Sequence, residues 1–209
     1  QDTSSAASDV YKRQPHHRTV TTTSDLAQTW FDRGLNWVYG FNHEEAIVCF
    51  ENAVAADPAC AMAHWGIAYA IGPNYNKAWE MFEPGERESA LATAHRAIAT
   101  GLAVEGLTVA EKALLDALET RYPKDPETGD FGPFNDAFAD AMRSVYDAHR
   151  NDLVVSSVFA EALMGRTPWA LWDLASGDTA EGASTGEARA VLEDAFGTQP
   201  AAWQHPGLL

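Results

Sequence analysis

Residues 30–58 read WFDRGLNWVYGFNHEEAIVCFENAVAADP, a pattern of two short helices separated by a turn. In each half the apolar residues recur at the spacing of one helical face. They are Trp30, Phe31, Leu35 and Val38, then Ala46, Ile47, Phe50, Ala53 and Val54. We expect Gly40 to end the first helix in a left-handed conformation, and Asn42 with Glu45 to cap the second reciprocally. The stretch therefore predicts an αα-hairpin.

The same hairpin resembles a tetratricopeptide repeat (TPR), a helix pair that stacks into solenoids. The signature positions that it fills are Trp30, Gly34, Ala46, Phe50, Ala53 and Pro58, with Trp37 at the aromatic position and Arg33 where leucine is usual. A weaker second repeat begins at Ala61, with Ala68, Ala90, Ala94 and Ala97 at small positions, His64 in place of the usual tryptophan, and residues 72–82 inserted. The chain thus resembles a divergent bacterial TPR protein over roughly its first half.

This resemblance implies an all-α fold, a right-handed stack of antiparallel helix pairs that forms a TPR-like α-solenoid. Helical spacing and punctuation predict helices at about residues 25–39, 43–56, 61–71, 86–100, 108–122, 132–145, 153–164 and 184–196. Capping boxes are predicted for Thr108 with Glu111 and for Ser184 with Glu187. Trp169 and Trp172 lie outside a clear helix, and we expect them to cover the edge of the stack.

The two ends of the chain differ from its middle. Residues 1–14 show no helical stripe and resemble a translated adapter, so we expect a non-native tail there. Residues 15–209 are expected to form a single TPR-like helical domain. Residues 203–209 read as the start of another helix, which predicts that this domain is truncated at its C-terminus.

The charge and composition of the chain disfavour some classes of binding partner. The 209 residues carry a formal net charge of −16, which disfavours nucleic acid and anionic membrane surfaces as partners. No apolar run of about twenty residues exists to span a bilayer. The two cysteines, Cys49 and Cys60, are predicted to be unpaired core residues, as in a reducing, cytoplasmic compartment.

The sequence carries no recognisable catalytic motif. The sequence contains no phosphate-binding glycine loop, nucleophile elbow or zinc-ligand run, so it predicts no catalytic or metal-binding residues and specifies no cofactor. His43 and Glu44 begin like a zinc-binding H-E-x-x-H motif, but Ile47 stands where its second histidine belongs.

A candidate polar site follows from the expected packing. The start of the second helix should lie near the end of the third, because successive helices run antiparallel. The candidate binding residues there are Asn42, His43, Glu44, Asn74, Asn76 and Trp79. The alternative reading is structural, since asparagines also serve as ordinary caps and turn residues.

Two functions remain open. The resemblance implies a scaffold that binds a protein or peptide in a concave groove, lined here by Phe31, Leu35, Tyr39, Trp65 and Tyr69. Because these side chains are apolar, either an apolar ligand or the chain's own later helices must cover them. We favour the later helices, since an open apolar groove promotes aggregation. The second function is a small-molecule- or metal-binding enzyme with its site at the polar residues above.

Overall fold

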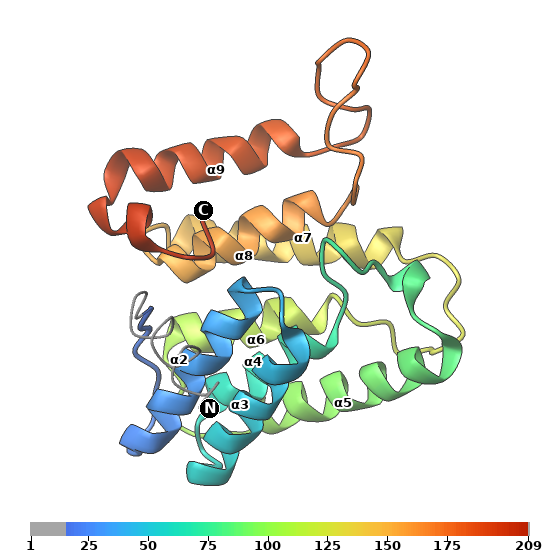
Figure 1. Cartoon of the computed structure of the whole chain (residues 1–209). Helices are drawn as coiled ribbons and strands as arrows, with labels where there is room; N and C mark the ends of the chain where they lie inside the picture. Colours follow the sequence, from blue (N-terminus) through green and yellow to red (C-terminus); the bar gives the residue numbers. More distant parts are fainter. Residues whose placement is uncertain (1–15, 209) are drawn as a thin grey trace, which may run out of the picture.

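The computed structural model describes residues 16–208, which fold into α-helices joined by turns and short 3-10 segments (Figure 1). The helices are α2 (Asp25–Tyr39), α3 (His43–Ala56), α4 (Ala61–Ile71), α5 (Pro84–Leu102), α6 (Val109–Glu119), α7 (Gly132–Ala148), α8 (Leu153–Met164) and α9 (Thr185–Thr198), with the 3-10 segments η1 (Trp79–Met81) and η2 (Pro200–Gln204). Within this part of the chain no β-strand forms, only two isolated bridges. The prediction of an all-α fold is confirmed.

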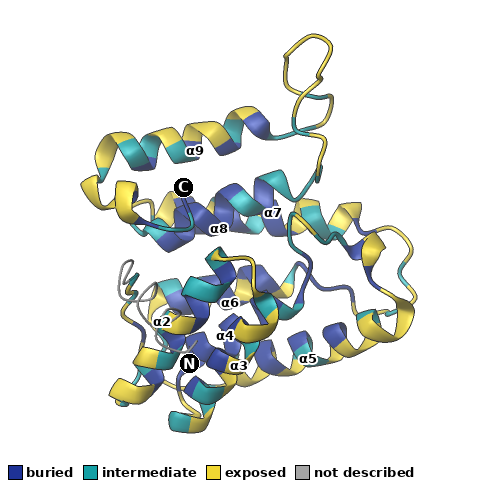
Figure 2. Ribbon diagram, in the orientation of Figure 1, coloured by how far each residue is buried: buried dark blue, intermediate teal, exposed yellow. Residues whose placement is uncertain are grey.

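Helices that follow one another in sequence pack side by side from α2 to α9, and α4 also contacts α2 and α6. One continuous core extends from α2 through α8 and reaches the inner face of α9. In Figure 2 the buried residues face the spaces between helices, while the outer faces are exposed. None of the described helices is both long and apolar enough to cross a membrane. The predicted tail, residues 1–14, lies outside the described residues.

The small residues of the hairpin allow α2, α3 and α4 to approach closely around one aromatic ring. Phe50 is fully buried on α3, between Gly34 of α2 and Gly66 of α4. A Cβ at Gly34 would lie 2.4 Å from the Phe50 ring, and one at Gly66 would lie 2.6 Å from it. Glycine is therefore required at both positions by the ring that separates the helices.

The turn between α2 and α3 differs from the expectation in its backbone. Gly40 has φ −82°, so it is not left-handed; the left-handed residue is Phe41, with φ 58°. The Asn42 N–H donates to the Trp37 carbonyl at 2.9 Å, which completes a Schellman-type turn. Asn42 does cap α3 by accepting from the Glu45 N–H, but its own N–H is used by Trp37, so the predicted reciprocal cap is wrong.

The other local predictions give mixed outcomes. The Thr108–Glu111 capping box forms as expected. Ser184 makes no capping bond; its hydroxyl accepts from Arg166, and Glu187 pairs with Arg143. Cys49 and Cys60 are buried and unpaired. Trp169 and Trp172 are 70% and 47% exposed, so the prediction that they cover the edge of the stack is wrong.

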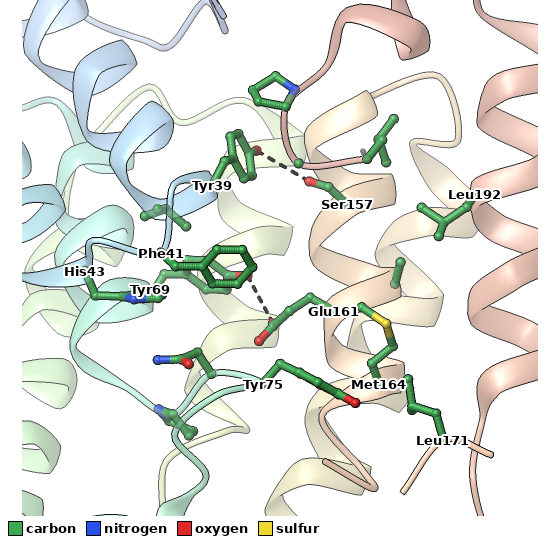
Figure 3. Close-up of a pocket in the computed structure, with 17 residues that line it drawn as sticks. Tyr39, Phe41, His43, Tyr69, Tyr75, Ser157, Glu161, Met164, Leu171 and Leu192 are labelled. Carbon is green, nitrogen blue, oxygen red and sulfur yellow. Dashed lines mark hydrogen bonds between the residues drawn. The ribbon is translucent and has the colours of Figure 1, made fainter. Parts of the chain in front are cut away.

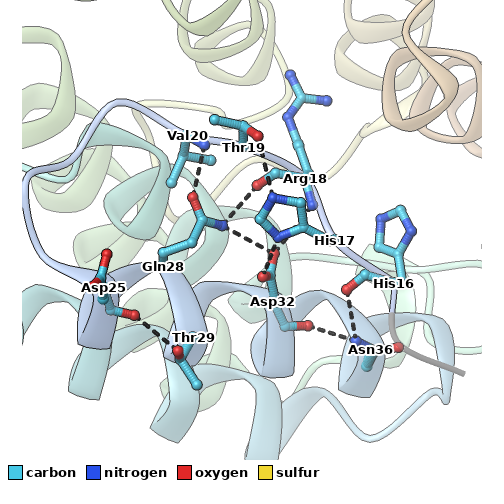
Figure 4. A network of polar contacts seen from close by, with 10 residues as sticks. All are labelled: His16, His17, Arg18, Thr19, Val20, Asp25, Gln28, Thr29, Asp32 and Asn36. Atoms are coloured by element: carbon cyan, nitrogen blue, oxygen red, sulfur yellow. Dashed lines mark hydrogen bonds and ion pairs between the residues drawn. The ribbon is translucent and has the colours of Figure 1, made fainter. Parts of the chain in front are cut away.

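The N-terminal segment that precedes α2 is tied by polar contacts to α2 (Figure 4) and to helices farther along the chain. His17 Nδ1 and the Arg18 N–H both contact the Asp32 carboxylate on α2. Arg18 also reaches Asp152, the N-cap of α8, at 2.7 Å. Thr21 donates twice to the buried carboxylate of Glu111 on α6. The segment therefore connects α2 to α6 and α8.

The five residues predicted to line a concave groove are covered by the chain itself. Phe31, Leu35 and Trp65 are at most 1% exposed. Tyr69 is buried and Tyr39 is half-buried, and their hydroxyls contact side chains of α8. This agrees with the alternative in which later helices cover the apolar face.

Replacing Trp65 with alanine should lower the free energy of unfolding by about 3–5 kcal/mol, because the side chain is fully buried and leaves a cavity. Denaturant unfolding measures this. Trp203→Ala is the matched control at a site 64% exposed, where the change should stay within about 0.5 kcal/mol. Equal losses in the two variants would contradict the packing described here.

A pair of glycine variants tests the close approach around Phe50. Gly66→Ala should destabilise by about 1–2 kcal/mol, since overpacking against the ring outweighs the better helix propensity of alanine. Gly197→Ala in α9 meets nothing within 4 Å, so propensity alone acts there and stability should not fall. A stabilising Gly66→Ala would show that the Phe50 ring is not confined.

Candidate functional site

A cavity of about 530 Å³ lies between the ends of α2 and α4 on one side and α8 with α9 on the other (Figure 3). Four separate parts of the chain form its wall. They contribute Val38, Tyr39, Phe41 and His43; Tyr69, Pro73, Asn74 and Tyr75; Ser157, Ala160, Glu161, Met164 and Leu171; and Leu192, Pro206, Gly207 and Leu208. Its size and mainly apolar wall with a few polar groups are typical of small-molecule sites.

The strongest polar feature of the cavity is a network centred on Glu161 of α8. The Tyr69 hydroxyl donates to Glu161 Oε2 at 3.0 Å, and an Arg121 guanidinium nitrogen lies 3.3 Å from Oε1. The Arg121 side chain is only 5% exposed, and its guanidinium lies over the Phe138 ring at 4.8 Å. The carboxylate thus faces the cavity while its cation is buried behind it.

The pKa values of Tyr69 and Arg121 are both raised. Desolvation raises the pKa of the Tyr69 hydroxyl well above its usual value, so Tyr69 remains a donor. Desolvation is the largest single effect and would lower the pKa of Arg121, but the charge and hydrogen bond of Glu161 together with Tyr122 and Tyr69 outweigh it, and the net pKa of Arg121 is raised. The guanidinium is therefore always charged.

A second polar contact lies at the other end of the cavity. The hydroxyls of Tyr39 and Ser157 are 3.4 Å apart and connect α2 to α8. Burial raises the pKa of Tyr39 to about 12, so this hydroxyl also stays protonated. Gly207 packs directly on the Tyr39 ring, where an added Cβ would lie 2.4 Å from the nearest ring carbon. The chain can close this end of the cavity because residue 207 has no side chain.

Of the predicted polar site, the structure brings His43 and Asn74 to the same cavity. Burial lowers the pKa of His43, against the opposing effect of Glu161, so its imidazole is neutral at neutral pH. The Asn74 carboxamide oxygen accepts the N–H groups of Asn76 and Lys77, which fixes the turn and leaves its NH2 group as the donor available to a ligand.

The remaining predicted binding residues do not line the cavity. Asn42, Glu44 and Asn76 are exposed, and Asn42 serves as a helix cap. Trp79 is 1% exposed and stacks on Phe131 at 5.4 Å, so it belongs to the core and not to a binding surface. Its place in the candidate site is corrected for this reason.

Sequence reasoning missed the whole wall provided by α8, α9 and the C-terminal residues. One signal was present: Glu161 is the single charged residue in the apolar helix LVVSSVFAEALM. A lone carboxylate on such a helix needs a buried partner or a functional reason. Its partner, Arg121, lies forty positions away in the sequence and could not be paired with it from spacing.

Backbone strain is concentrated beside the cavity. Among the described residues, Phe41 and Trp169 are the non-glycine positions with positive φ, at 58° and 62°. Phe41 lines the cavity, and Trp169 lies 5.4 Å from the ring of Tyr75, another lining residue. A left-handed backbone costs an aromatic residue roughly 1–2 kcal/mol, and such strain is often found at binding sites.

A cluster of histidines lies next to the Tyr39 end of the cavity. The rings of His16 and His205 are 4.2 Å apart, and each contacts the ring of Tyr39. Within the described part of the chain the Nε2 atoms of both histidines have no hydrogen-bond partner. The nearby charges are Arg18, His17 and Asp152. His205 directly precedes the residues that close the cavity.

Among residues 16–208, no three histidine, cysteine, aspartate or glutamate side chains gather closely enough to hold a metal ion. The polar groups of the cavity instead suit hydrogen bonding to an organic molecule.

Comparison of the chain with protein-family models, curated proteins and solved structures finds no match. The likeness to tetratricopeptide repeats therefore rests on the residue spacing described above.

The histidine cluster predicts a pH dependence of stability. Burial lowers the pKa of His16 to about 4 and that of His205 to about 3, from 6.5. Below pH 6.5 these two histidines are protonated in the unfolded chain but stay neutral in the folded chain. The free energy of unfolding therefore falls as the pH drops towards the folded pKa values. His205→Asn should reduce this slope by up to about 1.4 kcal/mol per pH unit.

Thermal unfolding between about pH 7 and pH 5 measures the slope, above most carboxylate titrations. Asparagine can still accept the Gly207 N–H that now bonds His205 Nδ1 at 3.2 Å, so the local turn is retained. If stability falls with pH equally steeply in the wild type and the variant, His205 is not buried in its neutral form.

Proposed function

We propose that the protein is a TPR-like stack of helix pairs that binds a small amphiphilic molecule in the cavity between α4 and α8. The observation that supports this most is the Glu161 carboxylate, which faces an apolar cavity with its cation buried behind it. A buried ion pair rarely stabilises a fold more than apolar packing would. A carboxylate that faces a cavity is instead well placed to recognise a ligand.

The groove residues favour this proposal over a peptide scaffold. A peptide in the concave groove would contact Phe31, Leu35 and Trp65, but these side chains are buried by the chain's own helices. The space that remains is a cavity of small-molecule size. Recognition of a protein partner would then need a different surface.

Binding is better supported than catalysis. Ser157 is the serine among the described residues that line the cavity. Its hydroxyl donates to the Val154 carbonyl at 2.9 Å and not to a base that could activate it. The hydroxyls of Tyr39 and Tyr69 are held protonated by raised pKa values. The neutral His43 imidazole could move a proton, but activated nucleophiles are normally paired with such a base by a direct hydrogen bond.

Fluorescence titration with the neutral dye N-phenylnaphthylamine tests the proposal. The dye should bind with a Kd below about 0.1 mM and become brighter as it leaves water. Ala160→Leu adds a larger side chain to the cavity wall and should weaken binding by about tenfold or more.

Ala92→Leu is the matched control, because Ala92 is exposed on α5, outside the cavity lining. It should bind the dye as wild type does, and melting curves should show that both variants fold. Equal binding by the two variants would place the dye elsewhere. Absence of dye binding to the wild type would contradict the proposed function.

A further inference from the structure

The cavity wall carries charge of one sign. Of the described residues that line it, Glu161 is the one with a formal charge at neutral pH, and no lysine or arginine is among them. The neutral polar groups come from Tyr39, His43, Asn74 and Ser157 with the other tyrosines. Arg121 neutralises Glu161 from behind, but it is 5% exposed and not part of the wall. A ligand therefore meets the carboxylate first.

Glu161 has unused capacity to accept hydrogen bonds. An ionised carboxylate offers about four lone-pair positions. In the described structure one bond from Tyr69 reaches Oε2, and one longer bond from Arg121 reaches Oε1. The Arg121 contact is single and 3.3 Å long, not a bidentate fork. The Glu161 side chain is 21% exposed, which leaves it accessible to a donor in the cavity.

The Glu161 charge also acts on His43, which lies in another part of the cavity wall. Burial lowers the pKa of His43, Glu161 opposes this effect, and Arg121 adds to it more weakly than Glu161 opposes it. At His43 the carboxylate therefore outweighs its own counter-ion. A net charge of −16 on the whole chain acts in the same direction.

Aromatic rings surround the same space. Phe41, Tyr69 and Tyr75 project into the cavity around Glu161 in Figure 3. Tyr69 already has the Arg121 guanidinium 5.6 Å from its ring centre, whereas Phe41 and Tyr75 carry no protein cation from the described residues. Aromatic faces attract cations, most strongly where water is excluded.

We propose that the cavity selects a small organic ammonium ion, whose N–H groups donate to Glu161 while its apolar body lies against Phe41, Tyr75 and the aliphatic wall. This inference rests on the proposed small-molecule function and specifies its ligand class. Glu161 is then the residue that determines charge specificity, and Arg121 positions it.

Three probes with the same phenethyl body test the charge preference on the wild-type protein. They are phenethylamine, phenethyl alcohol and phenylpropionate, each used to displace N-phenylnaphthylamine at neutral pH. Phenethylamine should bind about tenfold to a hundredfold more tightly than the alcohol, as expected for a charge-assisted hydrogen bond. Phenylpropionate should bind most weakly, because its carboxylate would face Glu161.

Glu161→Gln should remove the preference for the amine and leave the affinity for phenethyl alcohol within about threefold, since the side chain keeps its shape and one acceptor. This variant leaves the Arg121 charge buried without a carboxylate, which can prevent folding. The paired variant Arg121→Met with Glu161→Gln removes both charges and should give the same loss of preference.

The outcomes separate the two proposals. Dye binding by the wild type with equal displacement by amine and alcohol, or tighter binding of the propionate, would overturn the ammonium assignment and leave the cavity function intact. The same holds if the amine preference survives in Glu161→Gln or in the paired variant. Failure of the dye to bind at all would remove the proposed function itself.

Discussion

The buried guanidinium of Arg121 constrains how the helices around the cavity can pack. It lies just after α6, and it contacts Glu161 of α8, the Tyr69 ring of α4 and the Phe138 ring of α7. Moving such an ion out of water costs several kcal/mol unless partners surround it. The four helices must therefore meet at this point in one arrangement, because any other would leave the charge or the carboxylate without a partner.

Two polar contacts, one of them in this network, line an open space in an interior that is otherwise closely packed. Protein cores normally leave few voids larger than a water molecule. Here two polar contacts hold α8 at a distance from the first helices, Tyr69 with Glu161 at one end and Tyr39 with Ser157 at the other. A tyrosine bridging two helices through its hydroxyl spaces them by the length of its ring. Both contacts lie on the wall of the cavity (Figure 3).

Much of the fold could be predicted from local sequence, because helix periodicity and caps act within a few residues. The bounds of α3, α4 and α8 agree with the predicted ranges. The errors have both local and distant causes: the Asn42 N–H donates to the nearby Trp37 carbonyl, whereas the Ser184 hydroxyl bonds to a side chain from another segment. Ser184 was expected to cap α9, but its hydroxyl bonds to Arg166 instead. Trp172 was expected to cover the edge of the stack, but it is 47% exposed. About half of the cavity wall comes from α8 and the residues after it. Residue spacing in the sequence cannot predict that these lie next to α4.

The insertion after α4 contains one predicted binding residue that lines the cavity and others that do not. Spacing alone grouped Asn74 with Trp79, because both lie in the segment that a basic repeat lacks. In the structure Pro73, Asn74 and Tyr75 face the cavity, whereas Trp79 turns into the core against Phe131, close to the start of α7. The buried Trp79 fixes one end of the loop in the core, and this keeps Asn74 and Tyr75 at the cavity. A mobile loop could not present Asn74 and Tyr75 in fixed positions, so the structural role of Trp79 supports the site that it does not touch.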